Sequence, residues 1–278
     1  MPATPDLDAY FARVGFDGDA APTLATLERL HALHPAAIPF ENLSPFIGEE
    51  VALDLDSLQR KLVSGGRGGW CFEQNLLFAA VLRALGFRLT TLAARVRWNA
   101  PPGEPRPRSH MLLHVHLAEG DFIADVGFGG LVLTAPLRLR ADLEQQTPHE
   151  AFRLRESPRG TYLLEAKVAG EWAALHAFDL HEQLVPDYEV SNWYLLTNPA
   201  SQFLSNLIVA RAEPGARHAL RNARYSVHRP DGTTTRNFLH DVDALKQVLF
   251  EVMHLSVPDS SFLDTRLAEC MRREVQVP

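Results

Sequence analysis

The chain has 278 residues, a formal net charge of −7 and 46% hydrophobic residues. This hydrophobic content excludes a disordered chain, and the acidic balance argues against nucleic-acid binding, which needs a basic face. No apolar run is long enough to cross a membrane, and the first residues lack the basic and apolar regions of a secretory signal. Two cysteines provide no disulfide framework, so we expect a cytoplasmic protein with no nucleic-acid or membrane partner.

The first part of the chain, residues 1–86, has apolar residues at helical spacing. The pattern predicts helices over residues 7–14, 24–34 and 56–62, and a further helix that begins at Cys71 and ends near Gly86.

The sequence before Cys71 is Gly-Gly-Arg-Gly-Gly-Trp (residues 65–70). Glycines permit positive φ and leave no side chains to block a substrate. Cys71 would then be the first residue of a helix, where unpaired N–H groups and the helix dipole favour a thiolate. A cysteine in an apolar context is also commonly a buried structural residue, so the presence of a base and an orienting group elsewhere decides between the two interpretations.

A base and an orienting group are both available in the next segment. Residues 108–117 alternate in polarity, with His110, His114 and His116 on one face, and a second short strand ends at Asp125. A buried carboxylate needs a partner, and a histidine is the natural one. A two-residue turn at residues 119–120 would place Asp125 opposite His114, whereas a bulge or longer loop would change this register.

Metal binding is the alternative for these three histidines. Imidazoles two residues apart on a strand share a face and can chelate zinc. No second cysteine is spaced for ligation, because Cys270 lies far away in a charged C-terminal stretch. We therefore expect no metal, and we expect His114 and His116 to be exposed on the solvent face of a hairpin.

The remaining pattern divides the chain further. Residues 87–190 show mainly period-two alternation with regular turn signals, which suggests a β-barrel. Residues 191–278 mix strands near 207–212 and 225–229 with helices near 241–253 and 260–271, and we expect this part to close over the site as a lid.

Four ordered motifs resemble those of the arylamine N-acetyltransferase family. They are Arg-Gly-Gly-Trp-Cys-Phe-Glu-Gln-Asn (67–75), Pro-Phe-Glu-Asn-Leu (39–43), Arg-Ser-His-Met (108–111) and Asp-Val-Gly-Phe-Gly (125–129). The resemblance implies an α+β fold with an N-terminal helical bundle (1–86), a central antiparallel β-barrel (87–190) and a C-terminal α/β lid (191–278), with a papain-like Cys-His-Asp core between the first two parts.

The resemblance also implies a catalytic triad of Cys71, His110 and Asp125, and so favours His110 over His114. Acetyl-CoA would acetylate the Cys71 sulfur and release CoA, and an arylamine or hydrazine would then accept the acetyl group in a ping-pong scheme. The backbone N–H of Cys71 is a candidate oxyanion donor, because a helix start leaves it unpaired.

The family places Arg67 and Glu41 near the catalytic cysteine, and we interpret them as a structural ion pair, with solvated surface charges as the alternative. Glu73, in the first turn of its helix, complements the helix dipole.

The substrate pocket should be apolar and aromatic. Phe40 and Phe128 follow from their motifs, Phe203 from a looser likeness to a family position, and Val96 from its place on a strand over residues 89–98. For each phenylalanine, an ordinary core position is the alternative.

The glycine-rich turn at Gly127, Phe128, Gly129 and Gly130 follows a strand. It lacks the spacing of a dinucleotide fingerprint, since residue 132 is valine. Its backbone N–H groups could face a phosphate, so we expect contact with the CoA pyrophosphate.

Two other functions use the same residues differently. A thiol hydrolase or transglutaminase-like enzyme would share the Cys-His-Asp order, and a histidine-rich metal or scaffold protein would need no reactive thiol. Labelling with acetyl-CoA separates the first alternative, and metal analysis with alkylation of Cys71 separates the second.

Overall fold

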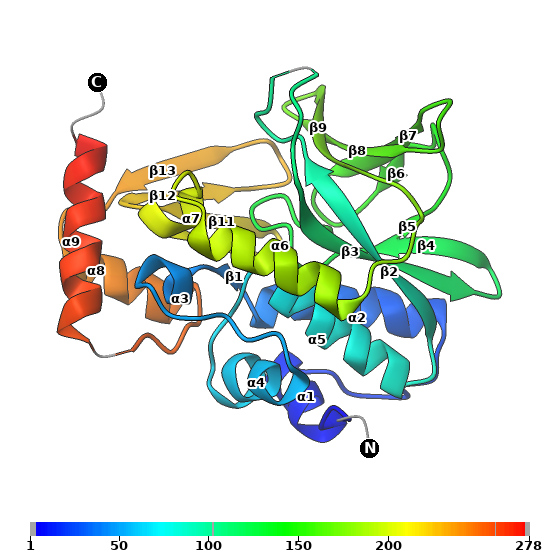
Figure 1. Cartoon of the computed structure of the whole chain (residues 1–278), viewed down its shortest axis with the longest axis horizontal. Helices are drawn as coiled ribbons and strands as arrows, with labels where there is room; N and C mark the ends of the chain where they lie inside the picture. Colours follow the sequence, from blue (N-terminus) through cyan, green and yellow to red (C-terminus); the bar gives the residue numbers. More distant parts are fainter. Residues whose placement is uncertain (1–3, 102, 259, 276–278) are drawn as a thin grey trace.

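The structure is a computed structural model that describes residues 4–101, 103–258 and 260–275. Figure 1 shows helices gathered around the N-terminal part, a curved sheet beside them, and a second sheet with the C-terminal helices at the opposite edge. Within the described residues no helix combines the length and apolar character needed to cross a bilayer.

The N-terminal part forms the helices that periodicity predicted and one short helix, over Leu43–Phe46, that was not predicted. They are α1 (Leu7–Val14), α2 (Leu24–Ala37), α3 (Leu43–Phe46), α4 (Leu55–Leu58), the π-helical segment η1 (Gln59–Ser64) and α5 (Cys71–Ala84). Asp6 caps α1 through the Ala9 N–H, and Thr23 caps α2 through the Thr26 N–H. The apolar faces of α1, α2 and α5 meet in one core, which includes Leu27, Leu30, Leu77 and Val81.

The central part is a nearly closed antiparallel barrel of eight strands in the order β5-β4-β3-β2-β9-β8-β7-β6. The strands are β2 (Arg88–Val96), β3 (Arg108–Leu117), β4 (Gly120–Ala124), β5 (Leu137–Arg138), β6 (Gln145–Gln146), β7 (Ala151–Glu156), β8 (Tyr162–Val168) and β9 (Glu171–Phe178). The predicted β-barrel is therefore confirmed.

Both faces of β3 are covered. Met111, Leu113 and Val115 pack into the core with the helices, whereas Leu112 packs into the barrel interior. His114 is only 7% exposed, so the prediction that it lies on a solvent face was wrong. Alternation alone predicts one exposed and one buried face, but the barrel and α5 cover this strand on both sides.

The register of the β3-β4 hairpin also differs from the prediction. Leu117 pairs with Gly120, so the turn consists of residues 118 and 119, and His114 pairs with Ile123. Asp125 follows the end of β4 and has no ladder partner on β3. The pairing of Asp125 with His114 that a turn at residues 119–120 would give therefore does not form, because the turn lies one residue earlier.

The C-terminal part begins with α6 (Val185–Thr197) and α7 (Gln202–Ser205) and continues as β10 (Ile208–Glu213), β11 (Ala216–Arg221), β12 (Arg224–His228), β13 (Thr234–Phe238), α8 (Val242–Gln247), the π-helical segment η2 (Val248–Val252) and α9 (Ser261–Val275). The strands form a five-stranded sheet in the order β1-β10-β11-β12-β13, in which β1 (Phe40–Glu41) comes from the N-terminal part.

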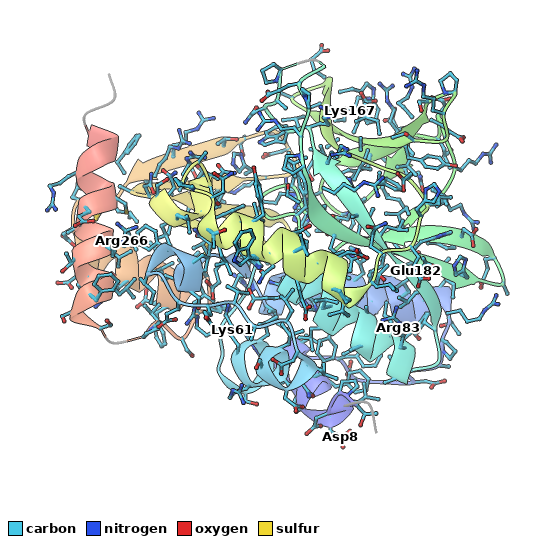
Figure 2. All side chains as sticks on the ribbon, in the orientation of Figure 1. Asp8, Lys61, Arg83, Lys167, Glu182 and Arg266 are labelled. Carbon is cyan, nitrogen blue, oxygen red and sulfur yellow. The ribbon has the colours of Figure 1, made fainter. Side chains whose placement is uncertain are left out.

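Helix α9 lies at the edge of the molecule far from the barrel (Figure 1). Arg266, labelled in Figure 2, anchors it: its Nε donates to the Phe46 carbonyl at 3.1 Å and its guanidinium lies 4.9 Å from the Phe46 ring centre. Leu263 and Leu267 join a separate apolar core with α8. Because β1 joins the C-terminal sheet, the N-terminal and C-terminal parts interlock, and the division near residues 86 and 190 stays a prediction.

Candidate active site

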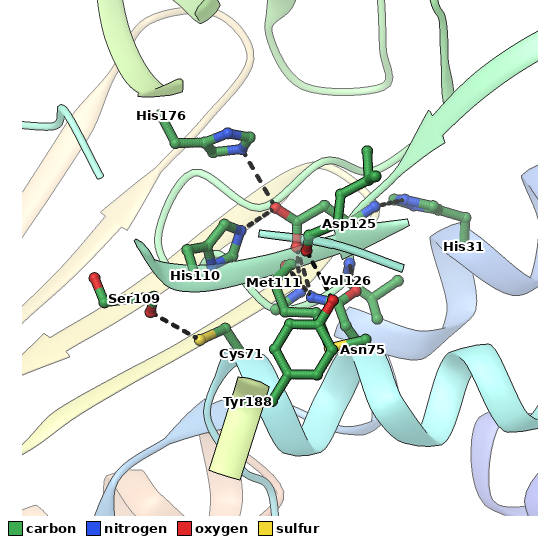
Figure 3. Close-up of polar contacts among 12 residues, drawn as sticks. His31, Cys71, Asn75, Ser109, His110, Met111, Asp125, Val126, His176 and Tyr188 are labelled. Atoms are coloured by element: carbon green, nitrogen blue, oxygen red, sulfur yellow. Dashed lines mark hydrogen bonds and ion pairs between the residues drawn. The ribbon is translucent and has the colours of Figure 1, made fainter. Parts of the chain in front are cut away.

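Cys71 is the first residue of α5 and is 7% exposed. Its Sγ lies 3.6 Å from the Ser109 carbonyl oxygen on β3 (Figure 3). A helix start directs unpaired N–H groups and the positive end of the dipole at this sulfur. The structure therefore places the thiol at the start of α5, where this helix meets the barrel.

The glycines before Cys71 serve mainly close packing. Only Gly66 of the four has a positive φ, at +62°. A Cβ on Gly68 would lie 2.0 Å from the Pro39 carbonyl oxygen, and one on Gly69 would lie 2.6 Å from Glu73 Oε2. The expectation that the glycines provide positive φ thus applies to one position. Gly68 and Gly69 let the loop pass close to Pro39 and α5, and Gly65 packs against η1.

His110 and Asp125 lie directly together beside Cys71 (Figure 3). His110 Nε2 is 2.6 Å from Asp125 Oδ2, and the two residues are 2% and 0% exposed. The Cys71 side chain interacts with His110 as well. The three residues of the predicted triad are therefore brought together, and His114 is not the partner of Asp125.

The electrostatics of the site favour a charged imidazole. Burial lowers the pKa of His110, but the Asp125 carboxylate and the Cys71 side chain outweigh it and raise this pKa to about 10. Burial raises the pKa of Asp125, and the facing rings of His110 and His176 outweigh that effect and lower it. At neutral pH the buried pair is thus an imidazolium and a carboxylate.

Asp125 is held by a set of hydrogen bonds that sequence reasoning missed. Its Oδ1 accepts from Asn75 Nδ2 at 3.0 Å and from the Gly127 N–H at 2.9 Å. Its backbone N–H donates to His31 Nε2 at 3.0 Å, and its Oδ2 lies 3.5 Å from His176 Nε2. These contacts fix the carboxylate from α5 and from the barrel, and the backbone of Asp125 from α2 (Figure 3).

Asn75 joins three parts of the site. Its Nδ2 also donates to the Met111 carbonyl on β3 at 2.8 Å, and its Oδ1 accepts from the Val126 N–H at 3.1 Å. The amide is 0% exposed, so each of these bonds replaces water that cannot reach it.

Gln74 holds the loop before Cys71. Its Nε2 donates to the carbonyls of Ile38, Pro39 and Gly69 at 3.1, 2.8 and 3.3 Å. Its Oε1 is then left to accept from His34 Nε2 at 2.7 Å. Gln74 and Asn75 are consecutive residues of α5. Gln74 holds the loop before the nucleophile, and Asn75 holds the carboxylate of the triad.

Two buried ion pairs support the same region. Arg67 Nη2 lies 2.8 Å from Glu41 Oε1, which confirms the predicted pair and excludes solvated charges, since Glu41 is fully buried. Glu73 does more than complement the dipole, because it accepts from the Trp70 N–H at 3.1 Å and pairs with Lys61 at 2.6 Å.

The predicted aromatic residues lie against two neighbours of Cys71 in the site, Trp70 and His110. Phe40 and Phe203 have ring centres 6.2 Å apart, and Phe203 packs edge-on against Trp70 at 5.6 Å. Phe128 packs edge-on against His110 at 5.1 Å. Val96 pairs with His176 across β2 and β9 and so shares its face of the sheet. Their roles toward a substrate stay predictions.

The glycine turn divides into two parts. Gly127 already donates its N–H to Asp125, and a Cβ there would lie 2.8 Å from Cys71 Cα. Gly129 has φ +86° and lies against the Phe40 ring, whereas Gly130 faces open space. The Gly127 N–H is thus already used to hold the triad carboxylate, so the predicted phosphate contact would involve residues 128–130.

Within the described part of the chain, two groups of side chains have metal-ligand atoms close together. One consists of His110, Asp125 and His176, and the other of His114, His116 and Asp121. The three histidines singled out in the sequence therefore divide between two groups. His176, which lies on β9, gave no local signal, since only the pairing of β9 with β2 brings it to the site.

Comparison with known proteins agrees with this geometry. A family model described as N-acetyltransferase matches residues 23–262. An arylamine N-acetyltransferase of Escherichia coli (strain K12) is 42% identical over 258 residues, which are 92% of this chain and 91% of that protein. The chain belongs to the arylamine N-acetyltransferase family.

Solved structures of arylamine N-acetyltransferases have the same fold. The enzyme from M. tuberculosis matches with a TM-score of 0.91 and 39% identity, over 94% of this chain and 99% of that one. The Mycobacterium marinum arylamine N-acetyltransferase in complex with CoA matches with a TM-score of 0.91 and 36% identity, over 95% and 99% of the two chains. The predicted family and the predicted enzyme class, an acyltransferase, are confirmed.

Proposed function

We propose that this arylamine N-acetyltransferase family member transfers acetyl from acetyl-CoA to the amino group of an arylamine or arylhydrazine through an S-acetyl Cys71. The observation that carries the proposal is the 2.6 Å contact of His110 Nε2 with Asp125 Oδ2 beside the Cys71 sulfur. Nucleophile, base and orienting group are then in the order that a thiol acyltransferase needs.

In the first half-reaction Cys71, with its proton on His110, attacks the thioester carbonyl carbon of acetyl-CoA. The tetrahedral intermediate collapses with cleavage of the bond between that carbon and the CoA sulfur, and His110 gives its proton to the leaving thiolate. The backbone N–H of Cys71 at the start of α5 is the proposed donor to the intermediate's oxyanion. The products are S-acetyl Cys71 and CoA.

In the second half-reaction the acceptor amine attacks the S-acetyl carbon. His110, now neutral, takes a proton from the amine nitrogen, and the carbon-sulfur bond to Cys71 breaks. Asp125 keeps the ring in one orientation and stabilises its charged form in both halves. The amide product leaves, and Cys71 and His110 return to their starting state.

The acceptor is expected to lie among the aromatic side chains next to Cys71. Phe40 and Phe203 form one wall, and Phe128 forms the other beside His110. An aryl ring gains burial and edge-on contacts there. Val96 contributes from β2, and Phe128, Gly129 and Gly130 are the proposed contacts of CoA, a ligand that the Mycobacterium marinum enzyme binds. We place the enzyme in the cytoplasm on its cysteine content, and the proposed reaction uses no metal cofactor.

Steady-state kinetics test this scheme. Initial rates with acetyl-CoA varied at several fixed arylamine concentrations should give parallel double-reciprocal lines, because CoA leaves before the amine reacts. Lines that intersect would contradict an acetyl-enzyme intermediate. Phe203→Ala should raise KM for an arylamine and leave the acetylation half-reaction unchanged, whereas a loss confined to acetylation would move Phe203 out of the acceptor site.

A further inference from the structure

A second group of ligand-type side chains lies on the β3-β4 hairpin, outside the triad. His114 and His116 project from the same face of β3, with ring centres 4.2 Å apart. Asp121 on β4 pairs directly with His116 across the ladder. The nitrogen and oxygen atoms that these three side chains offer lie within 4.8 Å of one another.

One member of this group has a polar atom without a hydrogen bond. His114 is 7% exposed, and its Nε2 is shielded from solvent and makes no hydrogen bond to any described residue. This nitrogen lies 3.3 Å from Asp121 Oδ2, but the two atoms are not aligned for a hydrogen bond. A buried nitrogen whose contact with a carboxylate is too poorly aligned for a hydrogen bond is costly, so its direction toward that carboxylate points to a ligand between the two.

The spacing of the donor atoms suits a small cation. His116 Nδ1 lies 2.9 Å from Asp121 Oδ1, on the other side of the same carboxylate. Tetrahedral zinc with bonds of about 2.0–2.2 Å separates neighbouring ligand atoms by about 3.3–3.6 Å. The His114 contact with Asp121 Oδ2, at 3.3 Å, already has this spacing, and the 2.9 Å His116 contact with Oδ1 must open slightly when a cation binds. Two imidazole nitrogens and one carboxylate oxygen form a donor set that Zn²⁺ prefers.

We propose that His114 Nε2, His116 Nδ1 and a carboxylate oxygen of Asp121 bind one divalent transition-metal cation of the Zn²⁺ class, with water completing its coordination. Thr90 supports the arrangement, since its Oγ1 lies 3.3 Å from His116 Nε2. When Nδ1 binds the cation, Nε2–H donates to that hydroxyl and fixes the ring.

The site is separate from the triad. His110 Nε2 is bonded to Asp125, and the cation site uses side chains nearer the hairpin turn, where β4 lies toward the edge opposite α9 in Figure 1. The hairpin is paired to β2 on one side and to β5 on the other. Its backbone therefore holds the ligands in place before a cation arrives.

The test is equilibrium dialysis of the full chain with zinc chloride alone, in a Cys71→Ala background that removes thiolate ligation. One zinc per chain is expected. His116→Gln and Asp121→Asn should each weaken the affinity at least about tenfold, since outer partners alone contribute factors of about 10–100. His181→Gln is the matched control, because His181 also pairs with an aspartate, Asp179, but has an 85% exposed side chain. It should bind like the parent.

Three results would overturn the proposal: no saturable binding, unchanged affinity in both hairpin variants, or loss in His176→Gln alone, which would move the cation to the triad. Thermal unfolding of each variant shows whether it is folded. The hairpin aspartate is nearly half exposed, so Asp121→Asn should stay folded if His116→Gln does not.

Discussion

Asn75 Nδ2 donates a hydrogen bond to Asp125 Oδ1 across 3.0 Å, from a position one helical turn after Cys71 on α5. The helix that presents the nucleophile therefore also orients the third member of the triad. A shift of α5 relative to the barrel would therefore disturb both the position of the nucleophile and the hydrogen bond that orients the carboxylate.

Asn75→Ala should lower kcat/KM about 100-fold, because small misplacement of a catalytic group has effects of that size. It should also lower the free energy of unfolding by about 1–3 kcal/mol for each buried group left unpaired. Urea unfolding and kinetics at matched folded fractions measure both. Asn192→Ala is the control, since Asn192 donates to the Val51 carbonyl away from the triad. Equal activity losses in the two variants would contradict a positioning role for Asn75.

Asp125→Asn should remove the charge that keeps His110 protonated. Burial then dominates, and the pKa of His110 should fall from about 10 to below its ordinary value. The thiolate loses its cation at neutral pH, and activity should fall by about 10⁴, as when the aspartate of a Ser-His-Asp triad is replaced. The rate of Cys71 alkylation by iodoacetamide should drop most below neutral pH.

Asp142→Asn is the control for the pH dependence of Cys71 alkylation, because Asp142 pairs with Arg155 and its side chain is 72% exposed. The profile of this variant should follow the parent. An unchanged profile in Asp125→Asn would show that Asp125 does not hold the charge of His110.

The sequence predicts the elements well and their long-range pairing poorly. Periodicity locates α5 and β3, and the family motifs identify His110, because both signals are local. The hairpin register depends on one turn, and a turn at residues 118–119 instead of 119–120 leaves Asp125 beyond the end of β4. Asp125 then reaches His110 from a loop, which no ladder argument can predict.

The supporting residues of the site were missed for a related reason. His31 on α2 and His176 on β9 lie far from Asp125 in sequence, and only the packed fold brings them to it. Asn75 was visible within its motif, but the role of its amide depends on which carbonyl faces it. His114 looked exposed because strand alternation gives two faces without saying what covers each.

The Glu41 and Arg67 pair should matter far more for stability than a surface pair does. Glu41→Gln leaves a guanidinium that is 12% exposed without its counter-charge, and breaking a buried pair costs about 3–5 kcal/mol. Glu144→Gln breaks the pair with Lys167, whose side chains are 44% and 39% exposed, and should change stability by about 0–1 kcal/mol. Urea unfolding should distinguish the two variants, and a similarly small loss of unfolding free energy in both would contradict the structural role of Glu41.

Acid should destabilise the fold through His34. Its Nε2–H donates to Gln74 and its Nδ1 lies 2.8 Å from the Tyr10 hydroxyl, so the ring is neutral, and burial lowers its pKa to about 3. In the unfolded chain His34 takes up a proton near pH 6.5, whereas in the folded chain it does so only near pH 3. This histidine's contribution to stability is therefore present above pH 6.5 and is lost as pH falls toward 3, by about 1.4 kcal/mol per pH unit.

His34→Gln should make the fall in unfolding free energy between about pH 6 and pH 4.5 shallower by that slope. His181→Gln, at an exposed position, should leave the slope unchanged. Urea unfolding at a series of pH values measures the difference, and equal slopes in all three proteins would show that His34 is not buried in its neutral form.

The most direct test is peptide-level mass spectrometry after mixing the protein with acetyl-CoA and no amine. The account predicts one acetyl group on the peptide that contains Cys71, its loss when an arylamine is added, and its absence in Cys71→Ala. Cys270→Ala, which changes a fully buried cysteine in the C-terminal core, should be acetylated like the parent. No acetyl group on Cys71, with rapid alkylation of the same thiol by iodoacetamide, would contradict the transferase mechanism and favour a thiol hydrolase.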